Sequence, residues 1–185
     1  MTRRVAVFGG AQPKPGEAAY EDALRLGKLI GQAGYELLTG GYIGTMEALS
    51  RGCSEAGGHV IGVTCDQIEA WRTVKANPWV QEEWHYASLQ ERIFALIENC
   101  DGLLALPGGV GTLAEIMLSW NLLLTHILPP QPLIMIGSGW QKTIQGFLTE
   151  QGDYIPEVQR QWVSFEPDVD SAFQRLQEIL SGDTL

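Results

Sequence analysis

Short apolar runs alternate with longer amphipathic segments along the whole chain. The runs predict six strands, the last of them the weakest: Val5–Phe8, Glu36–Thr39, Val60–Val63, Leu103–Leu106, Leu133–Ile136 and Trp162–Phe165. The intervening segments predict six helices: Glu17–Ala33, Thr45–Ala56, Leu89–Asn99, Thr112–Thr125, Trp140–Glu150 and Val169–Leu180. Strands that are apolar at every position are typical of a parallel sheet covered by helices on both faces. The alternation therefore predicts an α/β, doubly wound fold with a mainly parallel sheet.

No linker interrupts this pattern, and 185 residues suit one domain spanning 1–185. The least regular part is Cys65–Tyr86, which is rich in Trp, Asn and Pro. We expect it to be an ordered excursion near the mouth of a site or at a subunit contact.

Charge and composition exclude several classes of function. Twelve basic against 22 acidic residues give a net charge of −10, so no bulk field favours nucleic acid or an anionic membrane. The most apolar stretch, Ile116–Leu128, is too short and too polar to span a bilayer, and no targeting signal opens the chain. The three cysteines lie far apart and read as reduced thiols, not as a metal site. We therefore expect a cytoplasmic protein without metal that binds phosphate only locally.

One glycine pattern occurs twice, each time between a buried strand and a helix that opens with threonine. Glycine allows close backbone approach, and a helix start offers unpaired N–H donors and a positive dipole end. Glycine pairs also make ordinary tight turns, but two matching loops favour one phosphate or nucleotide site. Neither loop is a dinucleotide fingerprint or a P-loop. The candidate residues for binding the phosphate or nucleotide are Gly40, Gly41, Gly44 and Thr45 in the first loop and Gly108, Gly109, Gly111 and Thr112 in the second.

Two charged residues stand close to the second loop. Thr112 and Glu115 have the spacing of a capping box, a purely structural role; alternatively, Glu115 faces the sugar of a bound nucleotide. Arg92 lies beside the apolar strip of its helix. It is either an exposed arginine paired with a neighbouring carboxylate or a guanidinium that reaches a phosphate or orients Glu115.

The segment Pro107–Glu115 fits PGGxGTxxE, and it resembles the hallmark of the Lonely Guy (LOG) proteins. The resemblance extends to the earlier glycine loop and to Arg92, and it covers nearly the whole chain. It implies a Rossmann-like, often dimeric phosphoribohydrolase that cleaves cytokinin riboside 5′-monophosphates without a cofactor. Glu115 and Arg92 would then be the catalytic pair, and the second glycine loop would hold the 5′-phosphate.

The chain departs from the family pattern at two places. Ile93 replaces the lysine that usually follows the arginine, and Tyr42 replaces a third glycine. The wider superfamily includes molybdenum-cofactor carriers, so a binding or carrier protein is the alternative to a hydrolase. His85 and His126 are weak candidates for the acid that protonates the leaving base. Apolar residues surround most of the helix at Thr112–Thr125, which, with the resemblance, favours a homodimer.

Overall fold

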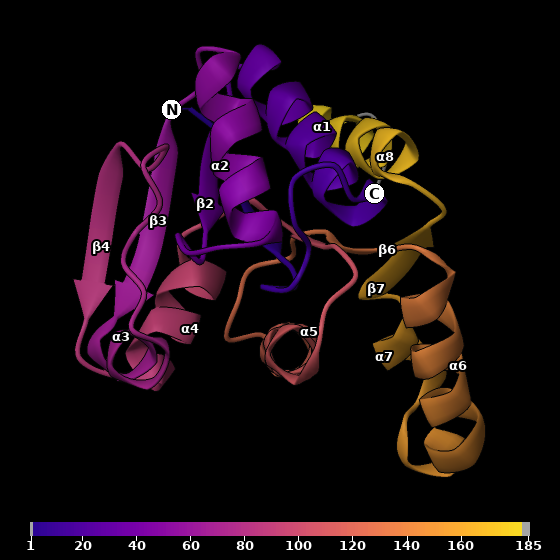
Figure 1. Ribbon diagram of the computed structural model, residues 1–185. Helices are drawn as coiled ribbons and strands as arrows, with labels where there is room; N and C mark the ends of the chain where they lie inside the picture. Colours follow the sequence, from indigo (N-terminus) through magenta and orange to yellow (C-terminus); the bar gives the residue numbers. More distant parts are fainter. Residues whose placement is uncertain (1, 183–185) are drawn as a thin grey trace.

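A seven-stranded, entirely parallel sheet forms the centre of the computed structural model, which describes residues 2–182 (Figure 1). The strand order is β4-β3-β2-β1-β5-β6-β7. This confirms the predicted α/β fold, including the six predicted strands. The strands are β1 (Arg4–Phe8), β2 (Glu36–Thr39), β3 (Val60–Cys65), β4 (Glu82–Tyr86), β5 (Gly102–Ala105), β6 (Leu133–Ile136) and β7 (Val163–Glu166).

Helices cover both faces of the sheet, as Figure 1 shows. One layer consists of α1 (Ala18–Gln32), α2 (Thr45–Glu55) and α8 (Val169–Ser181). On the other side lie α3 (Asp66–Arg72), α4 (Leu89–Glu98), α5 (Val110–Leu124), α6 (Ser138–Gln151) and α7 (Glu157–Arg160), with a 3₁₀ turn at Gly152–Tyr154. Alternate residues of β1 feed the two cores: Val5 and Val7 face the first layer, Ala6 and Phe8 the second.

The segment Cys65–Tyr86 contains two elements that the sequence pattern did not reveal, the short helix α3 and the strand β4. Among the strands of residues 2–182, β4 pairs only with β3, at the edge of the sheet. Only Trp84 and Tyr86 pack against the core, while Glu83 and His85 are exposed. Charged edge strands are common because they discourage pairing with other chains. The charged residues of β4 kept the sequence pattern from predicting this strand, and they are typical of a strand at the edge of a sheet.

The strand order places a topological switch beside β1. From β1 the chain winds outward through β2, β3 and β4, and it then returns to place β5 on the opposite side of β1. In open α/β sheets, ligands bind in the crevice at the carboxyl ends of the strands where the order reverses. The loops that follow β1 and β5 are thus the expected walls of a site.

Within residues 2–182, no helix is both long enough and apolar enough to cross a membrane.

Glycines bring α1 and α2 into close contact. A Cβ added to Gly52 would lie 2.1 Å from the carbonyl oxygen of Leu24, and one added to Gly27 would lie 2.2 Å from that of Leu49. Backbone atoms cannot yield as a flexible side chain can, so each glycine sets the distance between the two helices.

We expect Gly52→Ala to lower the free energy of unfolding by about 1–3 kcal/mol, the usual effect of overpacking. Gly146→Ala in α6 is the matched control, because a Cβ there meets no atom within 4 Å. It should be neutral or slightly stabilising, since alanine is the better helix former. Urea unfolding of both variants tests the contact, and equal stabilities would contradict it.

Candidate functional site

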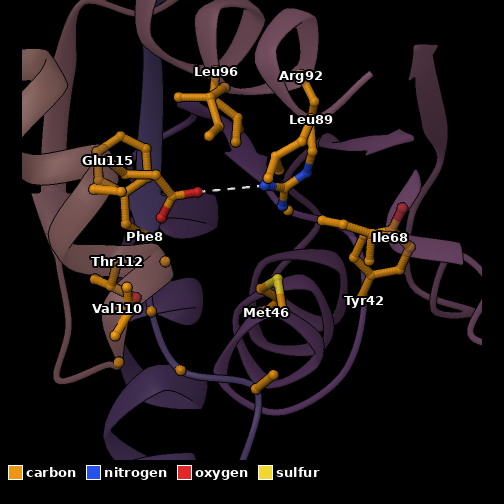
Figure 2. A pocket seen from close by; sticks show the side chains of 18 of the residues that line it. Phe8, Tyr42, Met46, Ile68, Leu89, Arg92, Leu96, Val110, Thr112 and Glu115 are labelled. Atoms are coloured by element: carbon orange, nitrogen blue, oxygen red, sulfur yellow. Dashed lines mark hydrogen bonds and ion pairs between the residues drawn. The ribbon is translucent and has the colours of Figure 1, made fainter. Parts of the chain in front are cut away.

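A cavity of about 710 Å³ opens at the carboxyl ends of the central strands (Figure 2). Its volume lies within the range of roughly 300–1,000 Å³ that is usual for ligand pockets. The walls come from the loops after β1 and β2, from α3 and α4, and from the start of α5. Of the predicted site residues, the cavity brings together Arg92, Glu115, Gly40, Gly109, Gly111 and Thr112.

The second glycine loop leads directly into α5. The helix begins at Val110, with Gly109 as its N-cap, two residues before the predicted start at Thr112. The first N–H groups of a helix have no intrahelical partner, and no side chain caps these. A Cβ on Gly108 would lie 2.2 Å from the Thr112 hydroxyl oxygen. The close approach of Thr112 thus requires glycine at position 108, which is exposed and does not line the cavity.

The capping-box interpretation of Glu115 is wrong. Thr112 lies inside the first turn of α5 and is not its N-cap, so the carboxylate has no capping partner there. The side chain instead borders the cavity and is buried, with 8% of the residue exposed.

The first glycine loop has mostly packing roles. Gly40 lines the cavity, and its lack of a side chain leaves room for the Arg92 guanidinium, since a Cβ would lie 2.1 Å from Nη2. Gly41, at φ +76°, packs against Gly62 of β3. Gly40 and Gly41 thus allow close packing against Arg92 and Gly62. Neither residue lies at the N-terminus of a helix, where free N–H groups would bind an anion.

The last two residues of this loop face the loop that follows β1. Gly44, at φ +74°, packs against Ala11, and both the N–H and the hydroxyl of Thr45 donate to the carbonyl of Gly10, each at 2.9 Å. Neither residue lines the site cavity. A phosphate-binding role for Gly41, Gly44 and Thr45 stays a prediction.

A third glycine loop, after β1, was missed as part of the site. Gly9 and Gly10 line the cavity, and the Gly10 N–H donates to the carbonyl of Pro107 at 3.2 Å. This contact joins the β1 loop to the second glycine loop. A glycine pair directly after the first strand was a signal for it, because the first strand of a doubly wound sheet often lies at the switch point.

Arg92 is buried, at 5% exposure, so the interpretation as an exposed surface arginine is wrong. Its Nε donates to the carbonyl of Val63 at 2.9 Å, and its guanidinium carbon lies 5.8 Å from the ring centroid of Tyr42. The Tyr42 hydroxyl is itself fixed, since it accepts from the N–H of Cys65 and donates to its carbonyl. The residue that replaces the family glycine thus holds the arginine in place.

Arg92 and Glu115 face one another across the cavity (Figure 2). Nη1 lies 3.4 Å from Oε1, which is longer than the 2.7–2.9 Å of a strong charge-assisted hydrogen bond. Burial raises the pKa of Glu115 to about 7, and Arg92 offsets only part of this effect. The carboxyl group can therefore exchange a proton near neutral pH, as an acid or base catalyst requires.

Apolar side chains form the remaining wall. Ile93, which stands where the family has lysine, lines the cavity with Phe8, Met46, Leu89 and Leu96. Within residues 2–182, Arg92 is the cation that forms an ion pair with Glu115. This surface suits a flat aromatic group.

Neither candidate histidine lies at the cavity. His85 contacts Asp66 and Thr64, each at 2.9 Å, and His126 packs edge-on against Trp162. His85 also lies near Glu69 and Glu83, and this group could hold a metal ion, although Lys75 already pairs with Glu69. No residue of this group lines the site cavity.

Comparisons with known proteins show the family and the fold of this chain. Residues 2–128 match the SLOG cluster4 family. The chain is 36% identical over 131 residues to the cytokinin riboside 5′-monophosphate phosphoribohydrolase LOG of Oryza sativa. The aligned region covers 69% of this chain and 53% of the relative. It is 29% identical to the probable phosphoribohydrolase LOGL9 of the same plant, over 95% of this chain and 78% of that one. The chain thus spans about half the length of the first relatives that it matches.

A solved structure shares the fold over the full length. The molybdenum cofactor binding protein from Rippkaea orientalis superimposes with a TM-score of 0.76 at 22% identity, covering 97% of this chain and 98% of the other. At this identity the likeness establishes the fold.

The raised pKa of Glu115 makes stability depend on pH. The folded protein binds the proton of the Glu115 carboxyl group more tightly than the unfolded chain does. The contribution of this group to the free energy of unfolding is therefore largest below about pH 4.5 and is lost as the pH rises through about 7. The Glu115→Gln variant cannot ionise at this position. Its melting temperature, relative to that of the parent protein, should therefore be higher at pH 8 than at pH 5. Each kcal/mol corresponds to about 2–4 °C in the melting temperature.

Thermal unfolding at both pH values measures this difference. Glu150→Gln, on the exposed face of α6, controls for the general loss of a carboxylate. If Glu115→Gln and the parent protein keep the same difference in melting temperature at pH 5 and pH 8, Glu115 ionises normally.

Proposed function

The chain belongs to the SLOG cluster4 family, and from this membership and its buried site we propose that it is a LOG-type phosphoribohydrolase. It would hydrolyse the N-glycosidic bond of a purine or cytokinin nucleoside 5′-monophosphate to the free base and ribose 5-phosphate. The observation that carries the proposal is the position of Glu115, a buried carboxyl group within about one turn of the uncapped N-terminus of α5.

The start of α5 is the proposed phosphate site. Gly109, Gly111 and Thr112 line the cavity there, and Gly108 allows the tight approach of the loop to Thr112. Backbone N–H groups and the helix dipole stabilise an anion at such a position. Because the phosphate lies away from the bond that breaks, its binding energy serves to position the ribose.

Glu115 and Arg92 are the proposed catalytic residues. As the glycosidic bond breaks, its electron pair leaves with the base and positive charge develops on the ribose. The Glu115 carboxylate stabilises this charge and accepts a proton from the water that attacks C1′. Arg92 keeps the carboxylate partly ionised in its buried position. The leaving base packs against the apolar wall and takes its proton from solvent.

A binding or carrier protein is the second candidate. The superimposed protein from Rippkaea orientalis is named for binding the molybdenum cofactor, and the two folds match over nearly their whole lengths. The replacement of the family lysine by Ile93 favours this reading, because it removes a cation beside the proposed reaction centre. Such a protein would use the same glycine loop to hold a phosphorylated ligand without hydrolysis.

We also propose a homodimer that uses α5. Ile116, Trp120 and Leu123 of this helix are buried within the chain, but Val110 is 85% exposed and Met117 is half-buried. An apolar face that the chain itself leaves uncovered is typical of subunit contacts. The predicted burial of this helix on several sides would then be completed by a second copy.

We expect the parent protein to release ribose 5-phosphate from AMP or isopentenyladenosine monophosphate. Glu115→Gln should lower kcat by about 10²–10⁴, the contribution of a positioned acid–base group. Arg92→Ala should also lower kcat, because the unpaired Glu115 would then be protonated at neutral pH. Product assays measure both changes, and Lys142→Ala on α6 is the control. Full activity of Glu115→Gln would remove this carboxylate from the mechanism.

The pH dependence of kcat/KM reports the same group in the free enzyme. If the ionised carboxylate is required, kcat/KM should rise about tenfold per pH unit below pH 7 and level off above it, since the pKa of Glu115 is about 7. A profile that is flat between pH 5.5 and 8 would show that Glu115 does not titrate as the catalytic base.

A further inference from the structure

A second groove, of about 540 Å³, adjoins the site cavity. The two share Ala11 and Gln12 of the loop after β1 and Trp71 and Arg72 at the end of α3. The site cavity alone already has the volume of a small-molecule pocket. The adjoining groove therefore provides space beyond what a mononucleotide needs.

Unpaired cations concentrate at this groove. Eight of the twelve lysines and arginines form ion pairs with carboxylates of residues 2–182, and Arg160 donates to backbone carbonyls. The three that do neither within this described part are Lys14, Arg72 and Lys142, and two of these line the groove. In a chain of net charge −10, two cations without a carboxylate partner beside one cavity favour an anionic group there.

The groove also offers an aromatic surface and polar groups. The Arg72 guanidinium carbon lies 4.4 Å from the ring centroid of Trp71, whose side chain is largely exposed. Glu47 accepts a hydrogen bond from the Tyr20 hydroxyl at 3.1 Å, and Gln12 lies beside them. Carboxylate and amide groups bind sugar hydroxyls, and an indole ring stacks on bases.

The site cavity meets the groove along the loop after β1, whose Ala11 and Gln12 line both. A Cβ on Gly10 would lie 3.5 Å from the Cα of Gly108, so the β1 loop lies directly against the second glycine loop. The same β1 loop continues through Ala11 and Gln12 into the groove. A 5′-phosphate at the start of α5 would therefore lie beside the loop that leads into the groove.

We infer that this groove binds a second phosphorylated half of a ligand, joined through the 5′-phosphate, as in a dinucleotide. Lys14 and Arg72 neutralise the added phosphate, Glu47 and Gln12 bind the added sugar, and Trp71 stacks on the added ring. The inference rests on the proposed phosphate site at α5 and extends the ligand class from mononucleotides to nucleotides that are substituted on phosphate.

Calorimetry with AMP and with diadenosine 5′,5′-diphosphate tests the groove. The parent protein should bind the dinucleotide at least about tenfold more tightly than AMP, or about 1.4 kcal/mol. The double variant Lys14→Ala/Arg72→Ala should lose most of this ratio, and Trp71→Ala should lose part of it. Lys142→Ala removes the third unpaired cation, which lies on α6, and should leave the ratio unchanged.

Equal affinity for the two ligands, or a preference that survives in the double variant, would overturn the inference. The outcome is separable from the proposed function. Turnover of AMP without any preference for the dinucleotide would leave the hydrolase and remove the groove. Binding of the dinucleotide through Lys14 and Arg72 without turnover of AMP would leave the groove and remove the hydrolase.

Discussion

The site depends on one buried carboxyl group with an incomplete counter-charge. Glu115 lies inside the protein with Arg92 at 3.4 Å, too far for a strong ion pair and near enough to limit the loss of charge. A tight pair would fix the carboxylate as an anion, whereas complete isolation would keep it protonated. The intermediate separation leaves the group able to change state near neutral pH, with its pKa at about 7.

This separation is set by parts of the fold that are far apart in the sequence. Arg92 is held by the carbonyl of Val63 and by the ring of Tyr42, and Gly40 leaves space for its guanidinium. Glu115 is fixed by the start of α5, one turn after the glycine loop. The two residues meet because α4 and α5, which precede and follow β5 in the sequence, pack on the same face of the sheet. The packing of these two helices thus determines the electrostatics of the site.

Most of the fold followed from the sequence, because buried parallel strands are continuously apolar. The structure confirms the six predicted strands, whereas β4 escaped notice because an edge strand can carry charges such as Glu83 and His85. The start of α5 was misplaced because Thr112 resembles an N-cap, although Gly109 ends the turn. Local patterns identify such elements well only where burial dictates the residue type.

The site was only partly predictable for a related reason. The sequence pattern identified Glu115 and Arg92, but spacing alone could not separate a capping box from a cavity carboxylate, or a surface arginine from a buried one. Those distinctions depend on contacts between distant loops. The same applies to Gly9 and Gly10. Their place in the site depends on the contact of Gly9 with Thr45 and on the hydrogen bond from Gly10 to Pro107.

The acidic composition gives the site its character. A chain of net charge −10 cannot attract phosphate by its overall field, so the attraction must come from backbone N–H groups and a few placed cations. Ile93 stands where LOG-type proteins usually carry a lysine, and burial is the largest cause of the raised pKa of Glu115. Lys14 and Arg72, which have no carboxylate partner within residues 2–182, line the adjoining groove, and Arg72 also lines the site cavity. In the proposed function, the phosphate is then held by the α5 terminus, and Arg92 is the cation that pairs with Glu115.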